Sequence, residues 1–151
     1  MSQVTVGASA LVHAPPATVY GILADYHDGH PHILPRPPFG ELVVESGGTG
    51  AGTVFRVQTR QGMKMRTFRM AVTEPEPGRL LKEQDLESDL FSTFRVDPAE
   101  GGHCRVTITT QWMRGGVQGW LESLLLPVLA APVYKKEIAN LERLAREWSG
   151  G

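Results

Sequence analysis

The sequence predicts an α+β fold in which a curved, seven-stranded antiparallel sheet wraps around one long C-terminal helix. Three observations support this. Apolar and polar residues alternate at the N-terminus, turn signals divide residues 40–112 into short runs of strand character, and residues 117–148 carry apolar side chains at steps of three and four. A chain of 151 residues is long enough for one core, so we expect a single domain over 1–151.

The N-terminal region predicts a strand followed by two short helices. Residues 3–13 alternate between Val or Ala and polar or small residues, which is the period of a half-buried strand. Pro15 and Pro16 suit the first turn of a helix, and the apolar residues from Val19 onward recur at helical spacing as far as Asp25. The loop that follows is rich in proline and glycine and has room for one more helical turn.

Residues 40–112 predict a meander of six further strands. Turn-forming residues interrupt the strand-like runs at 47–52, 61–62, 74–78, 87–89 and 97–102. Connections this short join neighbouring antiparallel strands. The cluster of glycines at 47–52 leads into a strand and has no following lysine, so it predicts a strand-to-strand turn instead of a phosphate-binding loop.

The last third of the chain predicts one long amphipathic helix. A helix of about 30 residues is about 45 Å long, enough to cross a whole sheet. Pro127 and Pro132 interrupt the pattern, and we expect a kink there because proline lacks an amide donor.

This order of elements, with several local matches, resembles the START-like (SRPBCC) superfamily and its helix-grip fold. The local matches are residues 14–20, Asp25, Gly50–Gly52, residues 74–80 and residues 101–107. The chain is most similar to the bacterial polyketide cyclase/dehydrase and lipid-transport group, although His30-Pro-His-Ile replaces a tryptophan that the family often carries. The resemblance implies a mostly apolar cavity between sheet and helix that holds a small hydrophobic molecule, without a metal or cofactor.

Pairing across the predicted hairpins indicates which side chains face that cavity. A turn at Gln61-Gly62 pairs Val57 with Arg66 and Phe55 with Phe68, and it places all four on one face of the sheet. A cation facing an apolar cavity needs an anionic partner, so Arg66 is predicted to orient a ligand carboxylate or carbonyl. The alternative is that Arg66 extends to the rim or meets a neighbouring acid.

A three-residue turn at 87–89 adds residues of the next hairpin, and the last strand and the helix complete the set. In this register Gln84 and Ser92 are polar members of an otherwise apolar face. The predicted ligand-contact residues are Phe55, Val57, Arg66, Phe68, Met70, Gln84, Ser92, Phe94, Ile108, Trp112, Trp120, Leu124 and Tyr134.

Composition excludes several classes of function. The net charge is -1, which disfavours nucleic acid and anionic surfaces as partners. Cys104 is the only cysteine, so no internal disulfide or multi-cysteine metal site is possible. No apolar run approaches the length of a membrane span, and the simplest localisation is the cytoplasm.

Loop histidines are the remaining chemical signal. His27, His30 and His32 lie near Asp25 and Asp28, which are residue types that bind metals, but no helix or strand aims them at one point. A role as general acid or base at the cavity entrance is the stronger interpretation.

Three functions therefore stay open. The first is a carrier or sensor of a lipid, quinone or polyketide-like molecule. The second is a cyclase, aromatase or dehydratase that uses Arg66, Tyr20, Tyr134 or a loop histidine for proton transfer. The third is an interaction domain whose cavity is filled by its own side chains. The absence of a compact acid/base pair in the sequence favours the first.

Overall fold

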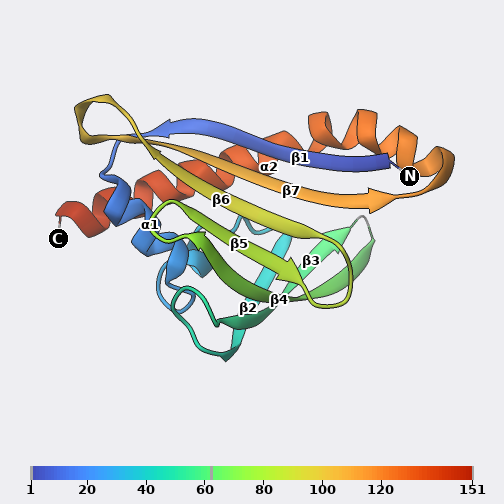
Figure 1. Ribbon diagram of the computed structural model, residues 1–151, viewed down its shortest axis with the longest axis horizontal. Helices are drawn as coiled ribbons and strands as arrows, with labels where there is room; N and C mark the ends of the chain where they lie inside the picture. The colour runs from blue at the N-terminus through green and yellow to red at the C-terminus, as the bar shows by residue number, and fades with distance from the viewer. Residues whose placement is uncertain (1, 62, 151) are drawn as a thin grey trace.

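The computed structural model describes residues 2–61 and 63–150; within α2 the side chains of 117–125 and of 127 and 128 lie outside the described set. The elements, in chain order, are β1 (Ser2–Val12), α1 (Pro16–Ala24), η1 (His30–His32), β2 (Phe39–Ser46), β3 (Val54–Gln61), β4 (Lys64–Glu76), β5 (Leu80–Asp85), β6 (Phe91–Pro98), η2 (Glu100–Gly102), β7 (Cys104–Arg114) and α2 (Gly116–Gly150) (Figure 1).

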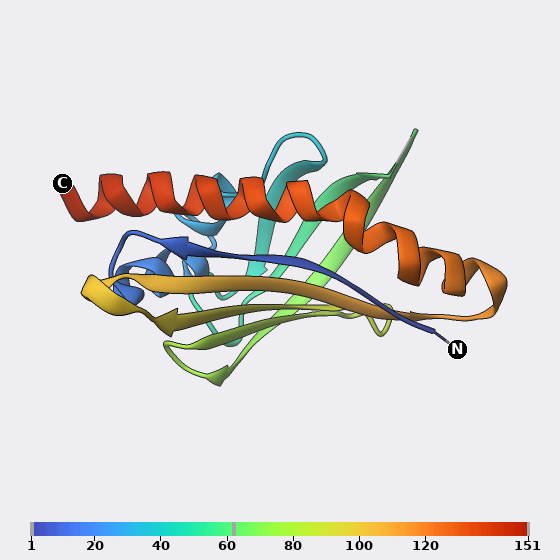
Figure 2. The same cartoon turned by 90° about the horizontal axis from the view of Figure 1, so that it is seen from above.

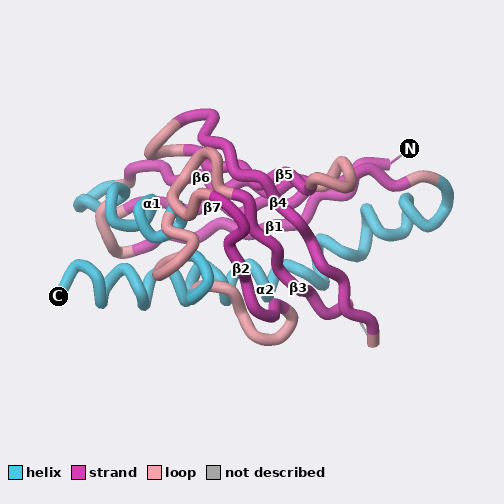
Figure 3. Tube along the Cα trace, turned by 90° about the horizontal axis from the view of Figure 1, so that it is seen from below, coloured by secondary structure: helices cyan, strands magenta, loops and turns pink. Residues whose placement is uncertain are grey.

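All seven strands form one antiparallel sheet in the order β1-β7-β6-β5-β4-β3-β2. Neighbours in the chain are neighbours in the sheet, except that β1 pairs with β7 along the far edge. The sheet curves, so that β2, β3 and β4 run at a steep angle to β1 and β7 (Figure 3). The predicted fold class is confirmed, and the second short helix is the single 3₁₀ turn η1.

α2 runs along the sheet and packs mainly on β1, while α1 packs against α2 and β6. Its 35 residues correspond to about 52 Å of helix. The helix is continuous through both prolines, and it bends in its orange N-terminal part (Figure 2). Across the described residues no helix is both long and apolar enough to span a membrane.

In the β3–β4 hairpin the predicted side chains face inward, but the pairing of the two strands differs from the prediction. Gln61 pairs with Lys64, Thr59 with Arg66 and Val57 with Phe68, two residues away from the predicted pairing. Because side chains alternate with a period of two, a shift of two residues leaves the same side chains on each face. The predicted turn residue Gly62 lies outside the described residues.

The predicted register of the β5–β6 hairpin is wrong by one residue. Gln84 pairs with Phe91 and Glu83 with Ser92, so the buried face of β5 carries Leu81, Glu83 and Asp85. The connection is longer than predicted because Asp85 organises it: its carboxylate accepts hydrogen bonds from the Glu87 amide and the Ser88 hydroxyl. A shift of one residue moves Gln84 off the cavity wall.

The glycine-rich segment between β2 and β3 is a turn held against the end of α1. The Gly50 amide donates to the Ala24 carbonyl, and the Tyr26 amide donates to the Gly48 carbonyl. Gly48 has a φ of +145°, and a Cβ there would lie 2.3 Å from the His27 ring. Glycine is needed for both reasons, and the turn fixes the chain at Ala24 and Tyr26, on either side of Asp25.

Candidate functional site

A cavity of about 720 Å³ lies between the inner face of the sheet and α2. Its wall is mainly apolar, and the residues that form it come from all seven strands, from η1 and the loop after it, and from α2. The apolar wall residues are Val6, Leu34, Phe39, Leu42, Phe55, Val57, Phe68, Met70, Leu90, Phe94, Trp112, Met113, Leu126, Ala130 and Tyr134. Volume and lining are those of a typical small-molecule site.

Most of the predicted ligand-contact residues line this cavity. On the wall are Phe55, Val57, Arg66, Phe68, Met70, Ser92, Phe94, Trp112 and Tyr134. Ile108 is instead completely buried in the core, and the Gln84 side-chain amide donates to the carbonyls of Asp85, Ser88 and Leu90. The side chains of Trp120 and Leu124 lie outside the described set.

The deep end of the cavity holds a buried polar cluster of Tyr26, His30 and Glu83. The Tyr26 hydroxyl donates to Glu83 Oε2 over 2.6 Å, and His30 Nε2 lies 3.4 Å from the same oxygen. His30 Nδ1 lies 2.8 Å from the Leu23 carbonyl oxygen. A carbonyl only accepts, so Nδ1 carries a hydrogen, and Nε2 is the nitrogen that faces Glu83.

Aromatic packing fixes the orientation of the His30 ring. Tyr26 stacks on His30 with ring centroids 4.6 Å apart and on Phe55 at 4.9 Å, and Phe94 meets His30 edge-on at 5.0 Å. His30 is only 1% exposed, so it belongs to the deep end and not to the entrance, whereas His27 and His32 are exposed. Within the described ranges no three His, Cys, Asp or Glu residues are placed to hold a metal ion.

Glu137 of α2 brings a second carboxyl to the same end of the cavity. It is 2% exposed and lies on the wall, and its carboxyl has no hydrogen-bond partner among the described residues. Burial, reinforced by the nearby Glu83, raises the pKa of Glu137 well above its ordinary value. Burial also raises the pKa of Glu83, although His30 and Tyr26 oppose this. Burial therefore favours the protonated, neutral form of the Glu137 carboxyl, which can donate a hydrogen bond.

Hydroxyl groups occupy the middle of the wall. The Tyr134 hydroxyl donates to Thr110 Oγ1 over 2.8 Å, and Ser92 Oγ lies 2.7 Å from the same atom. Burial raises the pKa of Tyr134 to about 12, so its hydroxyl keeps its proton. The other candidate, Tyr20, donates to Glu74 and is not on the wall.

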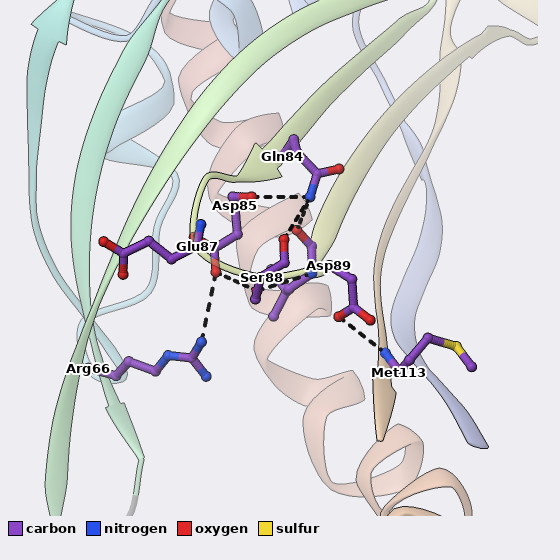
Figure 4. A network of polar contacts seen from close by, with 8 residues as sticks. Arg66, Gln84, Asp85, Glu87, Ser88, Asp89 and Met113 are labelled. Carbon is purple, nitrogen blue, oxygen red and sulfur yellow. Dashed lines mark hydrogen bonds and ion pairs between the residues drawn. The ribbon is translucent and has the colours of Figure 1, made fainter. Parts of the chain in front are cut away.

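The mouth of the cavity carries Arg66. Its guanidinium lies 3.8 Å from Asp85 Oδ2 and 4.4 Å from the centre of the Phe68 ring, and its side chain is 48% exposed. Figure 4 shows how the β5–β6 loop is held beside this arginine: Ser88 donates to Asp85, and Asp89 accepts from the Met113 amide over 3.4 Å. Arg66 thus meets a neighbouring acid at the rim, one of the two predicted alternatives.

The polyketide cyclase / dehydrase and lipid transport family matches residues 3–146. The chain belongs to this family. No protein with a curated description matches it. Among solved structures, the KanY protein is 29% identical, with a TM-score of 0.82 over 97% of this chain and 99% of KanY.

Two more distant structures share the helix-grip fold. The Zhui aromatase/cyclase from Streptomyces sp. R1128 is 16% identical over 95% of this chain and 94% of its own, with a TM-score of 0.74. Norcoclaurine synthase from Thalictrum flavum, solved in complex with dopamine and hydroxybenzaldehyde, is 16% identical over 96% and 87%, with a TM-score of 0.69. At such identities the likeness concerns the fold alone.

In this member of the polyketide cyclase/dehydrase family, sequence reasoning missed the deep cluster. Glu83 lies on the same face of β5 as the buried Leu81 and Asp85. Glu137 falls on the apolar stripe of α2, three residues after Tyr134. The available signal was an acidic residue at a position where the pattern calls for an apolar one. Burying a carboxyl costs free energy, so acids at such positions are rare and are candidates for a functional role. Together His30, Glu83 and Glu137 can accept and donate protons inside an apolar cavity, a compact acid/base arrangement that the sequence alone did not reveal.

Proposed function

We propose that this protein binds a small hydrophobic molecule, of the lipid, quinone or polyketide-like kind, in the cavity between the sheet and α2. The observation that carries the proposal is the open cavity of about 720 Å³ with an apolar wall. An interaction domain with a vestigial cavity would have filled that space with its own side chains. Burial of apolar ligand surface supplies the affinity, at about 25 cal/mol per Å².

The polar groups on the wall favour a ligand with oxygen atoms. The Glu137 carboxyl lacks a hydrogen-bond partner among the described residues, and its protonated form, which burial favours, can donate to a carbonyl or hydroxyl. A purely hydrocarbon ligand would leave that group unsatisfied, at a cost of about 1–3 kcal/mol.

The test is native mass spectrometry of the purified protein with identification of any molecule that is released. Ala130→Trp fills the cavity from α2, and the adjacent Leu129→Trp is the matched control because Leu129 is 69% exposed. We expect the wild type and Leu129→Trp to carry the same hydrophobic molecule and Ala130→Trp to be empty. A molecule retained equally by both variants would place it outside the cavity and overturn the proposal.

A second candidate function is turnover in the same cavity, as a cyclase, aromatase or dehydratase. The specific observation in its favour is the unpartnered Glu137 acid beside the Glu83–His30 pair. In a cyclisation with loss of water, His30 would take a proton from the carbon next to a ligand carbonyl. That carbon would attack a second carbonyl of the ligand, and Glu137 would give its proton to the oxygen of this second carbonyl as the carbon–carbon bond forms. In the loss of water, the Glu137 carboxylate would take the remaining proton from the same carbon while the protonated His30 gives its proton to the departing hydroxyl, which restores both groups.

Turnover is tested with a poly-β-keto thioester surrogate and product analysis by mass spectrometry. The wild type should speed cyclisation above the buffer rate, and Glu137→Gln should lower the rate by about 10²–10⁴-fold while binding changes little, because the amide keeps the shape but has no acidic proton. A wild-type rate equal to that of buffer would leave binding as the function.

A further inference from the structure

The two ends of the cavity have opposite electrostatic character. Glu83 and Glu137 lie at the deep end, and Arg60 and Arg66 lie on the wall near the tip of the β3–β4 hairpin. Arg66 and Val72, the residue that pairs with Glu83, are six residues apart on β4. At about 3.3 Å per residue, about 20 Å separates the backbone of Arg66 from that of Val72. The Arg66 side chain extends back along the strand toward Asp85, which lies two residues from Glu83 on β5.

The deep end disfavours an anion. Glu83 and Glu137 are 6% and 2% exposed, and each already resists ionisation because burial leaves its charge unsolvated. The one basic group among the described residues there, His30, is engaged by Glu83. A third carboxylate would meet two acids and no free cation.

At the mouth, Arg66 and Thr59 have hydrogen-bond donors that could bind an anion. Arg66 makes a single long contact of 3.8 Å with Asp85, whereas a charge-assisted hydrogen bond is about 2.7–2.9 Å long. Its neighbour across the hairpin, Thr59, has a buried hydroxyl on the cavity wall without a partner in the described structure. On the outer face of the same strand, Arg69 is held by Glu45 at 2.8 Å.

We propose that the mouth is an anion subsite and that the cavity takes an amphiphilic carboxylic acid, with the tail toward Glu137 and the carboxylate against Arg66. The proposal rests on hydrophobic binding in the cavity and adds the ligand class and its orientation. Arg66 would exchange its long contact with Asp85 for a direct one with the ligand, and the Thr59 hydroxyl lies beside it as a second donor.

The first test compares dodecanoate, dodecanol and dodecylamine by isothermal titration calorimetry near neutral pH. Dodecanoate should bind roughly tenfold more tightly than dodecanol, since one charge-assisted contact at a half-exposed site is worth about 1.4 kcal/mol. Arg66→Gln should remove this preference and leave dodecanol binding unchanged. Arg69→Gln, on the outer face of β4, is the matched control and should keep the preference; Arg60→Gln tests the rim independently and should reduce it.

Orientation is read by ¹³C NMR titration of dodecanoate labelled at its carboxyl carbon. A carboxylate at the arginine-lined mouth should titrate at or below its pKa in free solution, and one at the deep end should titrate above it.

Each outcome decides between the two proposals. Equal binding of dodecanoate and dodecanol, tighter binding of dodecylamine, a raised pKa of the bound acid, or equal effects of Arg66→Gln and Arg69→Gln would overturn the anion subsite while hydrophobic binding stands. If none of the three probes binds, both proposals fail.

Discussion

Replacing Glu137 by leucine should stabilise the ligand-free protein. Glu137 is 2% exposed and its carboxyl has no hydrogen-bond partner in the described structure, so folding takes most of its surface out of water without a compensating hydrogen bond. That loss costs about 1–3 kcal/mol, and a leucine avoids it. Because the side chain faces an open cavity, leucine gains only part of the energy of full burial. We expect Glu137→Leu to raise the free energy of unfolding by about 2 kcal/mol at pH 4, where the carboxyl is largely protonated in both the folded and the unfolded state.

The pH dependence of this effect has a definite sign. The unfolded chain releases the Glu137 proton near the ordinary pKa of 4.5, whereas the folded protein retains it because burial, together with Glu83, raises the pKa. Above pH 4.5 the folded state therefore binds more protons than the unfolded state, and stability falls as pH rises. Each such group contributes up to about 1.4 kcal/mol per pH unit in this window. Glu83 acts in the same direction.

Urea unfolding between pH 4 and 8, followed by circular dichroism, measures both effects. The advantage of Glu137→Leu over the wild type should grow with pH. Glu137→Gln is the control, because the amide does not titrate but leaves a polar group unpartnered, so it should flatten the pH dependence with little stabilisation at pH 4. A leucine variant that is less stable than the wild type at pH 7, or two parallel stability curves, would refute the reasoning.

Three further predictions concern other parts of the molecule. Tyr26→Phe should lower the free energy of unfolding by about 1–3 kcal/mol in urea, because Glu83 loses a buried hydrogen bond while the ring stacking is kept; an unchanged midpoint would contradict that bond. Gly48→Ala should lower the melting temperature by several degrees, since its Cβ would lie 2.3 Å from the His27 ring at a φ of +145°, and an unchanged melting temperature would mean that the turn adjusts freely. Cys104 should not react with a thiol reagent at pH 8 until urea unfolds the protein, because burial raises the pKa of its thiol to about 11; rapid labelling of the folded protein would show that Cys104 is accessible.

The β3–β4 hairpin shows why an inner face is easier to predict than a register. Phe55, Val57, Arg66, Phe68 and Met70 line the cavity although the predicted pairing was two residues off. Side chains alternate between the two faces of a strand, and this alternation can be read from the sequence itself. An error of two residues in the pairing therefore leaves every side chain on its correct face.

The β5–β6 hairpin shows the opposite case. The predicted register was wrong by one residue, so it placed Gln84 on the cavity wall and Glu83 and Asp85 on the outer face, the reverse of the observed arrangement. The error arose from the length of the loop, and that length depends on hydrogen bonds that the Asp85 side chain makes with Glu87 and Ser88 after folding.

By itself the sequence determined the order of the elements, the faces of most strands and the apolar stripe of the last helix, because these follow from local periodicity. Only the tertiary structure decided the chemistry of the cavity. Tyr26, His30, Glu83 and Glu137 come from a loop, a 3₁₀ turn, a central strand and the C-terminal helix, and each looks ordinary in its own segment. Their protonation depends on mutual distance and on exclusion of water, and both arise when the sheet closes around α2.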